Sequence, residues 1–535
     1  MSDPVGQLRG AVEAAMRATT GDGLPKKASR FSLERPRQAE HGDYATNAAM
    51  LLAKTAGAPP REVAERLAGV LRDDLGDRLT SAEIAGPGFL NLRLADAWYA
   101  DALGGLLADD GFGGGGAAVE KVNLELVSAN PTGPLHVGHA RNAAYGDALG
   151  RILAFHGHQV EREYYVNDYG TQVALLGQSI VARAKGEEPP EDGYVGDYVR
   201  ELAAELGDAV DGAPQDVAQA GVDAMLRRIA GSLEAFRVHI DRWFSERSLH
   251  EGEPSAVRRA FDVLEQQGHS YRAEGALWLR TRDFGDDKDR VIERSSGEHT
   301  YFASDIAYAQ HKRERGYDRF IYVLGADHHG YIARMKAAYQ ALGGEPDALE
   351  LLIMQFVHLV SGGERLSMSK RAGSFETLDD LVAAVGVDAA RWFLLNRSHD
   401  STIEFDLDLA REQSSENPVY YVQYAHARIA SILRKAGGAE AASAQPAEPL
   451  HDAERALIRK LLMFPAEVAE ASERRAPHRI ATYALELAQT FTAFYRDCQV
   501  VGTRSEPWRL ALCVASQRTI ARSLDLLGVS APDEM

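Results

Sequence analysis

The chain has 535 residues, enough for three or four domains and a large core. Hydrophobic residues make up 45% and charged residues 26%, which is typical of a soluble globular protein rather than a disordered one. The net charge of −19 argues against a general nucleic-acid coat protein, although a local basic surface on an acidic body is still compatible with it.

The two cysteines, Cys498 and Cys513, are too few for a disulfide framework, and their spacing does not suggest zinc. The first residues lack the basic flank and apolar run of a signal peptide, and no apolar stretch is long enough to span a bilayer. We therefore expect a cytoplasmic protein with no membrane partner.

Residues 1–107 predict a compact α+β unit. Residues 6–19 and 59–75 have helical periodicity, whereas 89–95 alternate like a strand. Residues 108–121, "ADDGFGGGGAAVEK", predict a flexible glycine-rich linker and the clearest domain boundary in the chain.

Residues 122–400 alternate between strand and helix patterns, which predicts a mostly parallel sheet covered by helices. The candidate strands are 122–127, 159–166, 276–281, 290–295, 319–325 and 351–360. Residues 184–199 are acidic and interrupted by proline and glycine, so we expect a surface excursion there. From roughly residue 401 the patterns are helical and predict a bundle, with candidate helices 417–436, 452–471, 477–500 and 508–528.

The stretch "NPTGPLHVGHARNA", residues 130–143, joins the first of these strands to a helix that we expect to begin near Val137. A helix N-terminus suits phosphate, and Gly138 would let a flat ring approach the backbone. His136 and His139 are three residues apart, so both can face one ligand. The alternative is a proline-rich turn with two surface histidines; a metal site is a weaker reading.

A second motif, "GGERLSMSKRAGSF" at 362–375, follows the apolar strand 351–360. On its own, a basic loop rich in serine and glycine is typical of a solvated surface. Together the two motifs resemble the signatures that flank ATP in class I aminoacyl-tRNA synthetases. The second match is imperfect, because Ser367 and Arg371 replace the family's first lysine and final serine, while Lys370 is retained.

Longer blocks are similar to arginyl-tRNA synthetases: 124–143, 162–173, 300–308, 368–381 and 386–395, with 41–54 and 86–94 near the N-terminus. The resemblance implies a multidomain α/β protein. Its parts would be a Rossmann-like catalytic domain with an insertion at 122–400, an N-terminal domain at 1–107 that contacts tRNA, and a helical anticodon-binding domain at 401–535. The implied reaction is ATP-dependent ligation of L-arginine to its cognate tRNA through arginyl-adenylate, with Mg²⁺ accompanying ATP but no protein metal cage.

The resemblance also implies roles for single residues. The catalytic set would be His136, His139 and Lys370, and the ATP site would add Gly138, Gly325, Asp327, Met368 and Ser369. Around arginine it implies Glu125, Asn130, Tyr301, Asp305 and His328, the last standing where many relatives have glutamine. Asp305 could instead cap a helix. Tyr301 and Asp305 are four residues apart, so a helix would present them on one face.

For tRNA, the resemblance points to Tyr421, Tyr424 and Arg428 in the bundle, since aromatic and arginine side chains suit splayed bases. The alternative is that the tyrosines belong to the bundle core and the arginine to a solvated face. Two other functions stay open: a class I synthetase for another amino acid, such as cysteine, and a catalytically silent RNA-binding paralogue. We expect a monomer.

Overall fold

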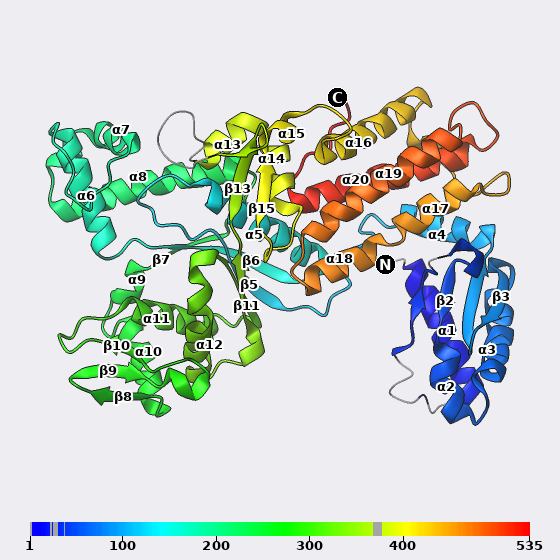
Figure 1. Cartoon of the computed structure of the whole chain (residues 1–535), viewed down its shortest axis with the longest axis horizontal. Coiled ribbons are helices and arrows are strands. Elements are labelled where there is room, and N and C mark those ends of the chain that lie inside the picture. Colours follow the sequence, from blue (N-terminus) through cyan, green and yellow to red (C-terminus); the bar gives the residue numbers. More distant parts are fainter. Residues whose placement is uncertain (1–2, 22–23, 25–29, 37, 367–376) are drawn as a thin grey trace.

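The computed structural model describes residues 3–21, 24, 30–36, 38–366 and 377–535. Figure 1 shows a central sheet region, a helical bundle to one side of it and an N-terminal domain against the bundle. Met368, Ser369 and Lys370 lie outside the described residues, so the expectations for them are not tested here. No helix in the described part of the chain is long and apolar enough to cross a membrane.

The N-terminal domain is the predicted α+β unit. Its antiparallel sheet has the order β1 (Leu33–Glu34), β2 (Tyr44–Thr46), β4 (Phe89–Leu94), β3 (Leu79–Ala85). The sheet packs against α2 (Ala48–Ala56) and α3 (Pro60–Leu75), and α1 (Pro4–Thr20) packs on both helices. The last helix, α4 (Asp96–Ala108), instead packs against α17 (Asp452–Leu461) and α20 (Glu506–Leu527) of the bundle.

The glycine-rich segment 108–121 contacts the rest of the chain at several points, and its role as a linker stays a prediction. Phe112 is buried, and the Gly115 N–H donates to the Phe155 carbonyl at 2.8 Å. Arg518 of α20 donates to the carbonyls of Leu107 and Asp109, both at 2.8 Å. The small residues therefore allow the chain to run close to its neighbours.

The central sheet is parallel, as predicted, with the order β12 (Leu349–Met354), β11 (Arg319–Gly325), β5 (Lys121–Glu125), β6 (Gln159–Val166), β7 (Arg242–Ser245). Helix α5 (Val137–His156) connects β5 to β6 and packs closely on the sheet. A Cβ at Gly146 of α5 would lie 2.6 Å from Cβ of Leu126, so this approach needs glycine.

Two strand predictions need correction. Residues 276–281 and 290–295 do not join the parallel sheet; β8 (Ser270–Ala273), β9 (Ala276–Leu279) and β10 (Arg290–Glu293) form a separate antiparallel sheet. The turn between β8 and β9 is Glu274-Gly275, with φ of 51° and 79°, and a two-residue hairpin of this kind forces antiparallel pairing. Helices α10 (Ala256–Gln266) and α11 (Tyr301–Glu314) contact this sheet, and α9 (Arg247–His250) and α12 (Ile332–Ala341) pack on those helices (Figure 1).

The predicted strand 351–360 is split between β12 and β13 (Val357–Ser361). Strand β13 lies between β14 (Glu364–Arg365) and β15 (Ile403–Asp406), so the chain is not helical throughout after residue 401. Helices α13 (Leu378–Val385), α14 (Val387–Leu395) and α15 (Leu407–Arg411) adjoin this small sheet.

The bundle itself begins at α16 (Pro418–Lys435) and continues with α17, α18 (Phe464–Glu473), α19 (His478–Asp497) and α20. The predicted helix 452–471 is therefore two helices. A buried ion pair of 2.6 Å between Arg391 of α14 and Asp147 of α5 lies beside the end of α20, where Arg391 also donates to the Leu527 carbonyl at 2.8 Å. The acidic stretch 184–199 leads from α6 (Thr171–Ala184) into α7 (Asp197–Leu206) and α8 (Pro214–Ala235), which protrude from the body (Figure 1).

Candidate active site

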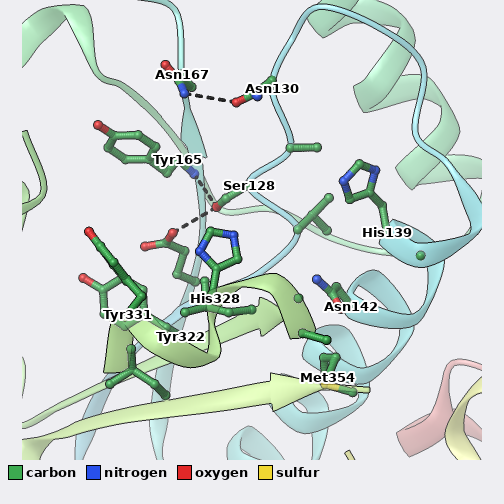
Figure 2. A pocket seen from close by; sticks show the side chains of 18 of the residues that line it. Ser128, Asn130, His139, Asn142, Tyr165, Asn167, Tyr322, His328, Tyr331 and Met354 are labelled. Carbon is green, nitrogen blue, oxygen red and sulfur yellow. Dashed lines mark hydrogen bonds between the residues drawn. The ribbon is translucent and has the colours of Figure 1, made fainter. Parts of the chain in front are cut away.

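A cavity of about 740 Å³ opens at the carboxyl ends of β5, β6, β11 and β12. Strand order reverses between β5 and β11, and ligands of open parallel sheets bind at such a point. Figure 2 shows Tyr322, His328 and Tyr331 on one side of this cavity and His139 and Asn142 on the other.

The backbone is unusual where the chain leaves β5 and enters the cavity wall. Val127 and Ser128 have φ of 67° and 44°, a region that a β-branched residue such as valine rarely adopts. The Ser128 hydroxyl donates to Glu125 Oε1 at 3.1 Å and accepts from the Tyr165 N–H at 3.0 Å (Figure 2). Such strain gathers at functional sites, where surrounding contacts hold it.

The two histidines of the first motif form the N-terminal cap of α5, and both line the cavity as predicted. Nδ1 of His136 accepts from the Gly138 N–H at 3.0 Å, and Nδ1 of His139 accepts from the His136 N–H at 3.3 Å. The rings stack with centroids 3.7 Å apart. With Nδ1 as the acceptor, a neutral ring carries its proton on Nε2.

Gly138 serves this cap directly. A Cβ there would lie 2.8 Å from Cε1 of His136, so any other residue would displace the imidazole. Gly138 also lines the cavity, so the expectation that a ligand ring approaches it there stays a prediction.

The chain that follows the second motif reaches the first motif. Thr377, the first described residue after position 366, forms an isolated antiparallel bridge with His136. The Leu378 N–H donates to the Leu135 carbonyl at 2.8 Å. Thr377 and Leu378, directly after the undescribed residues, therefore lie at the start of α5, although the two motifs are more than 200 residues apart in sequence.

Glu125 lines the cavity but already has a cationic partner. Its Oε2 accepts a hydrogen bond from Nζ of Lys312 at 2.7 Å. Lys312, on α11, is 1% exposed, and its Nζ lies 3.7 Å from Glu163 and about 4 Å from the ring centroids of Tyr308 and Tyr322 (4.2 and 4.0 Å). The sequence analysis missed Lys312, which neutralises the carboxylate expected to hold a guanidinium.

Asp305, also on α11, lines the cavity, and its environment differs from that of Glu125. The pKa of Asp305 is raised to about 7, chiefly by burial and also by the nearby carboxylates Glu246 and Glu125, against the lowering effects of Tyr331 and Arg334. The alternative that Asp305 caps a helix is wrong, because α11 begins four residues earlier. A carboxyl whose ionised form is unfavourable in a cavity is stabilised when a cation binds beside it.

Of the remaining residues predicted to bind arginine, two line the cavity and one does not. Asn130 lines the cavity, and its side chain donates to Gln172 at 2.8 Å and accepts from Asn167 at 3.0 Å (Figure 2). His328 also lines the cavity, with its ring 6.1 Å from that of Tyr331. Tyr301 is not among the lining residues: it is 69% exposed at the first position of α11, one turn nearer to solvent than Asp305.

The predicted third ATP element follows β11. Gly325 lines the cavity at the end of that strand, and Asp327 lies in the 3₁₀ turn Ala326–Tyr331. The side chain of Asp327 is outside the description, so its role stays a prediction.

A second group of predicted residues lies far from the cavity, on the bundle. Arg428 lies 4.7 Å from the ring centroid of Tyr424 and 5.5 Å from that of Tyr495, and both tyrosines are exposed. Tyr421 is half-buried and donates to Thr492 of α19 at 3.1 Å, so it joins two helices. Sequence analysis missed Tyr495, which belongs to another helix.

Three family models match the chain. "tRNA synthetases class I (R), catalytic domain" matches residues 106–192 and 237–430, "Arginyl tRNA synthetase N terminal domain" matches 6–94, and "DALR anticodon binding domain" matches 422–535. A solved structure described as a putative arginyl-tRNA synthetase from Campylobacter jejuni is 37% identical over 83% of this chain and 100% of its own, with a TM-score of 0.77.

The chain belongs to the arginyl-tRNA synthetase family. The Thermus thermophilus arginyl-tRNA synthetase is 26% identical over 99% of both chains, with a TM-score of 0.75. The Plasmodium falciparum enzyme, 17% identical over 100% of both chains with a TM-score of 0.75, shows the shared fold. The protein is thus an arginine–tRNA ligase that acts in translation, and ATP is its substrate.

The family-model matches do not cover every part of the chain. The catalytic match omits residues 193–236, which include α7 and α8. The N-terminal match ends at residue 94, before α4, whereas the sequence analysis ended that domain at residue 107.

Proposed function

We propose that the cavity at the end of the parallel sheet forms arginyl-adenylate and then transfers the arginyl group to the 3′-terminal hydroxyl of tRNA. The observation that supports this most is the pairing of a histidine-capped helix N-terminus with a half-buried carboxyl of raised pKa, Asp305, in one cavity. The first suits phosphate and the second suits a guanidinium.

At the phosphate end, the arginine carboxylate attacks the α-phosphorus of ATP and pyrophosphate leaves. The N-terminus of α5 and the Nε2–H groups of His136 and His139 stabilise charge on the α-phosphate oxygens. Lys370 stabilises the leaving pyrophosphate; Thr377, seven residues after it in sequence, pairs with His136. No side chain becomes covalently bonded in this scheme, since positioning and charge carry the step. Gly325 and Asp327 would contact the nucleoside, together with Met368 and Ser369.

At the arginine end, we assign the main guanidinium contact to Asp305. Glu125 is already neutralised by Lys312, so it contributes hydrogen-bond acceptors rather than net charge. Ionised Asp305 would accept two parallel N–H bonds from the planar guanidinium, a geometry that a lysine ammonium cannot match. Asn130 and His328 would contact the α-amino group and the backbone of the amino acid, and Tyr301 stays outside this shell.

A magnesium ion would be held mainly by the phosphates of ATP. In the described ranges no three His, Cys, Asp or Glu side chains gather as metal ligands.

For tRNA recognition, the cluster Tyr424, Arg428 and Tyr495 would receive anticodon bases by stacking, with Tyr421 supporting it from within the bundle. The N-terminal domain would contact the body of the tRNA. We propose its boundary at residue 95 rather than 107, because α4 packs on the bundle. We further propose a cytoplasmic monomer.

The test is aminoacylation with Asp305→Asn and Arg428→Ala variants. The proposal requires a loss in the apparent affinity for arginine with the first and for tRNA with the second. If either variant instead affects the other substrate, the assignment of the two sites is wrong.

A further inference from the structure

The exposed aromatic side chains of the described residues include Tyr424 and Tyr495 of the bundle cluster, Phe89 of β4 and Trp243 of β7. Three others are near the rim of the cavity: Phe356 lines the cavity, and the Tyr301 hydroxyl lies 3.4 Å from Thr171, two residues after the exposed Tyr169. We infer that the stacked pair Tyr169–His250 at this rim is a binding surface for the unpaired 3′-terminal nucleotides of tRNA. This inference rests on the proposed transfer step at the same cavity.

In the stacked pair, the imidazole of His250 is largely covered and the ring of Tyr169 is exposed. The rings of Tyr169 and His250 are parallel to within 10°, with centroids 4.0 Å apart. His250 is nearly covered: its Nε2 lies 3.1 Å from the Ser304 hydroxyl and 3.9 Å from Glu246. Tyr169 stays 46% exposed, so it covers one face of the imidazole and offers its own surface to solvent.

Hydrogen bonds to the neighbouring residue Asp168 fix the loop that carries Tyr169. The buried Asp168 accepts from the Ser245 hydroxyl at 2.6 Å and from the Arg247 N–H at 3.0 Å. Such anchoring reduces the entropy that binding would cost, because the aromatic surface is already positioned.

The loop that carries Tyr169 contacts Asn130, which lines the cavity, so the Tyr169–His250 pair lies at the rim. Asn167 and Gln172, on either side of Tyr169 in sequence, both hydrogen-bond Asn130 of the cavity wall. Thr171 lies 3.4 Å from the Tyr301 hydroxyl, so a second exposed ring adjoins the loop. Ser304, which contacts His250, directly precedes Asp305 of the cavity.

The chemistry of the reaction identifies the occupant. The terminal ribose must enter the cavity for transfer, so the nucleotides that precede it must cross the rim unpaired. Unpaired bases stack on aromatic side chains whatever their sequence, with a contribution that corresponds to about tenfold in affinity per base. An anchored, exposed tyrosine beside the substrate cavity provides that surface.

The test compares equilibrium binding of two forms of an arginine-accepting tRNA, one intact and one lacking its last three nucleotides. The wild type should bind the intact form more tightly. Tyr169→Ala should lose about tenfold on the intact form and nothing on the shortened form, whereas Tyr169→Phe should match the wild type. The matched control, Tyr424→Ala in the bundle, should weaken both forms equally.

Equal binding of the two forms by the wild type, or an equal loss on both forms by Tyr169→Ala, would overturn the inference. A higher KM for arginine in Tyr169→Ala with unchanged tRNA binding would assign the pair to the amino-acid site instead. Charging of arginine by the wild type is measured separately, so failure of the proposed function is distinguished from failure of this surface.

Discussion

Replacing Asp305 with Asn should weaken arginine binding but increase stability. The ionised Asp305 carboxylate is unfavourable in the folded protein, and it is also the group that we expect to bind arginine. The ordinary pKa of this carboxyl is 3.8, and burial raises it to about 7. That difference corresponds to about 4 kcal/mol in favour of the neutral form. Above pH 7 the folded protein therefore carries an unfavourable charge, which bound arginine relieves.

The sign of the pH dependence follows from this direction. Between pH 4 and pH 7 the folded state keeps a proton on Asp305 that the unfolded state has lost, so the free energy of unfolding contributed by this group falls as pH rises. Arginine needs the ionised carboxylate, so its affinity should rise with pH up to about 7 and then level off. Glu246, Glu125, Tyr331 and Arg334 face the same group and set the position of this transition.

Asp305→Asn removes the charge and keeps the shape. Loss of a desolvated charge contact costs about 2–5 kcal/mol, so kcat/KM for arginine should fall by about 30-fold to several thousand-fold. At pH 8 the variant without substrate should unfold at higher urea concentration than the wild type, and the rise of arginine affinity between pH 6 and 7 should vanish.

The assay is aminoacylation from pH 5.5 to 8.5, with urea unfolding at pH 5 and pH 8. Uncharged citrulline as a competitor should bind both proteins with similar affinity, and lysine should be rejected by the wild type. Glu314→Gln, the same change at an exposed position of α11, is the matched control and should alter neither property. An equal loss for arginine and citrulline, or a destabilised variant at pH 8, would refute the reasoning.

Three further variants test other parts of the site. Lys312→Met should lower the free energy of unfolding by about 3–5 kcal/mol, because Glu125 would be left buried without its cation; a change below about 1 kcal/mol in urea unfolding would contradict the pairing. Lys370→Ala should slow ATP–pyrophosphate exchange by about 10²–10³-fold with an unchanged melting temperature; near-normal exchange would remove this lysine from the mechanism. Deletion of residues 1–94, which keeps α4 on the bundle, should raise the KM for tRNA and leave that for arginine unchanged; an unchanged KM for tRNA would refute the role of the N-terminal domain.

Much of the architecture could be predicted because strand and helix periodicity are local properties. The parallel sheet, the bundle and the α+β domain follow from such patterns, and the resemblance to arginyl-tRNA synthetases is confirmed. The antiparallel sheet was not predicted. Strands 276–279 and 290–293 resemble the strands of the parallel sheet in composition and differ from them only in the strands with which they pair. Glu274-Gly275 was the available signal, as a two-residue turn with positive φ.

The site could be predicted in part for a similar reason. Asp305, Tyr308 and Lys312 share one face of α11 at spacings of three and four residues, but a lysine near the end of a helix normally faces water. Its burial against Glu125 depends on β5, more than 180 residues away in sequence. The resemblance placed Tyr301 at the arginine site, yet α11 begins at this residue and its side chain is 69% exposed.

The most direct measurement is charging of an arginine-accepting tRNA by the wild-type protein with each of the twenty amino acids in turn, in the presence of ATP. The account predicts that arginine alone is esterified to the 3′ end, and that its kcat/KM rises between pH 6 and pH 7 as Asp305 ionises. Charging with a different amino acid, or a folded protein that binds arginine and tRNA without joining them, would contradict it.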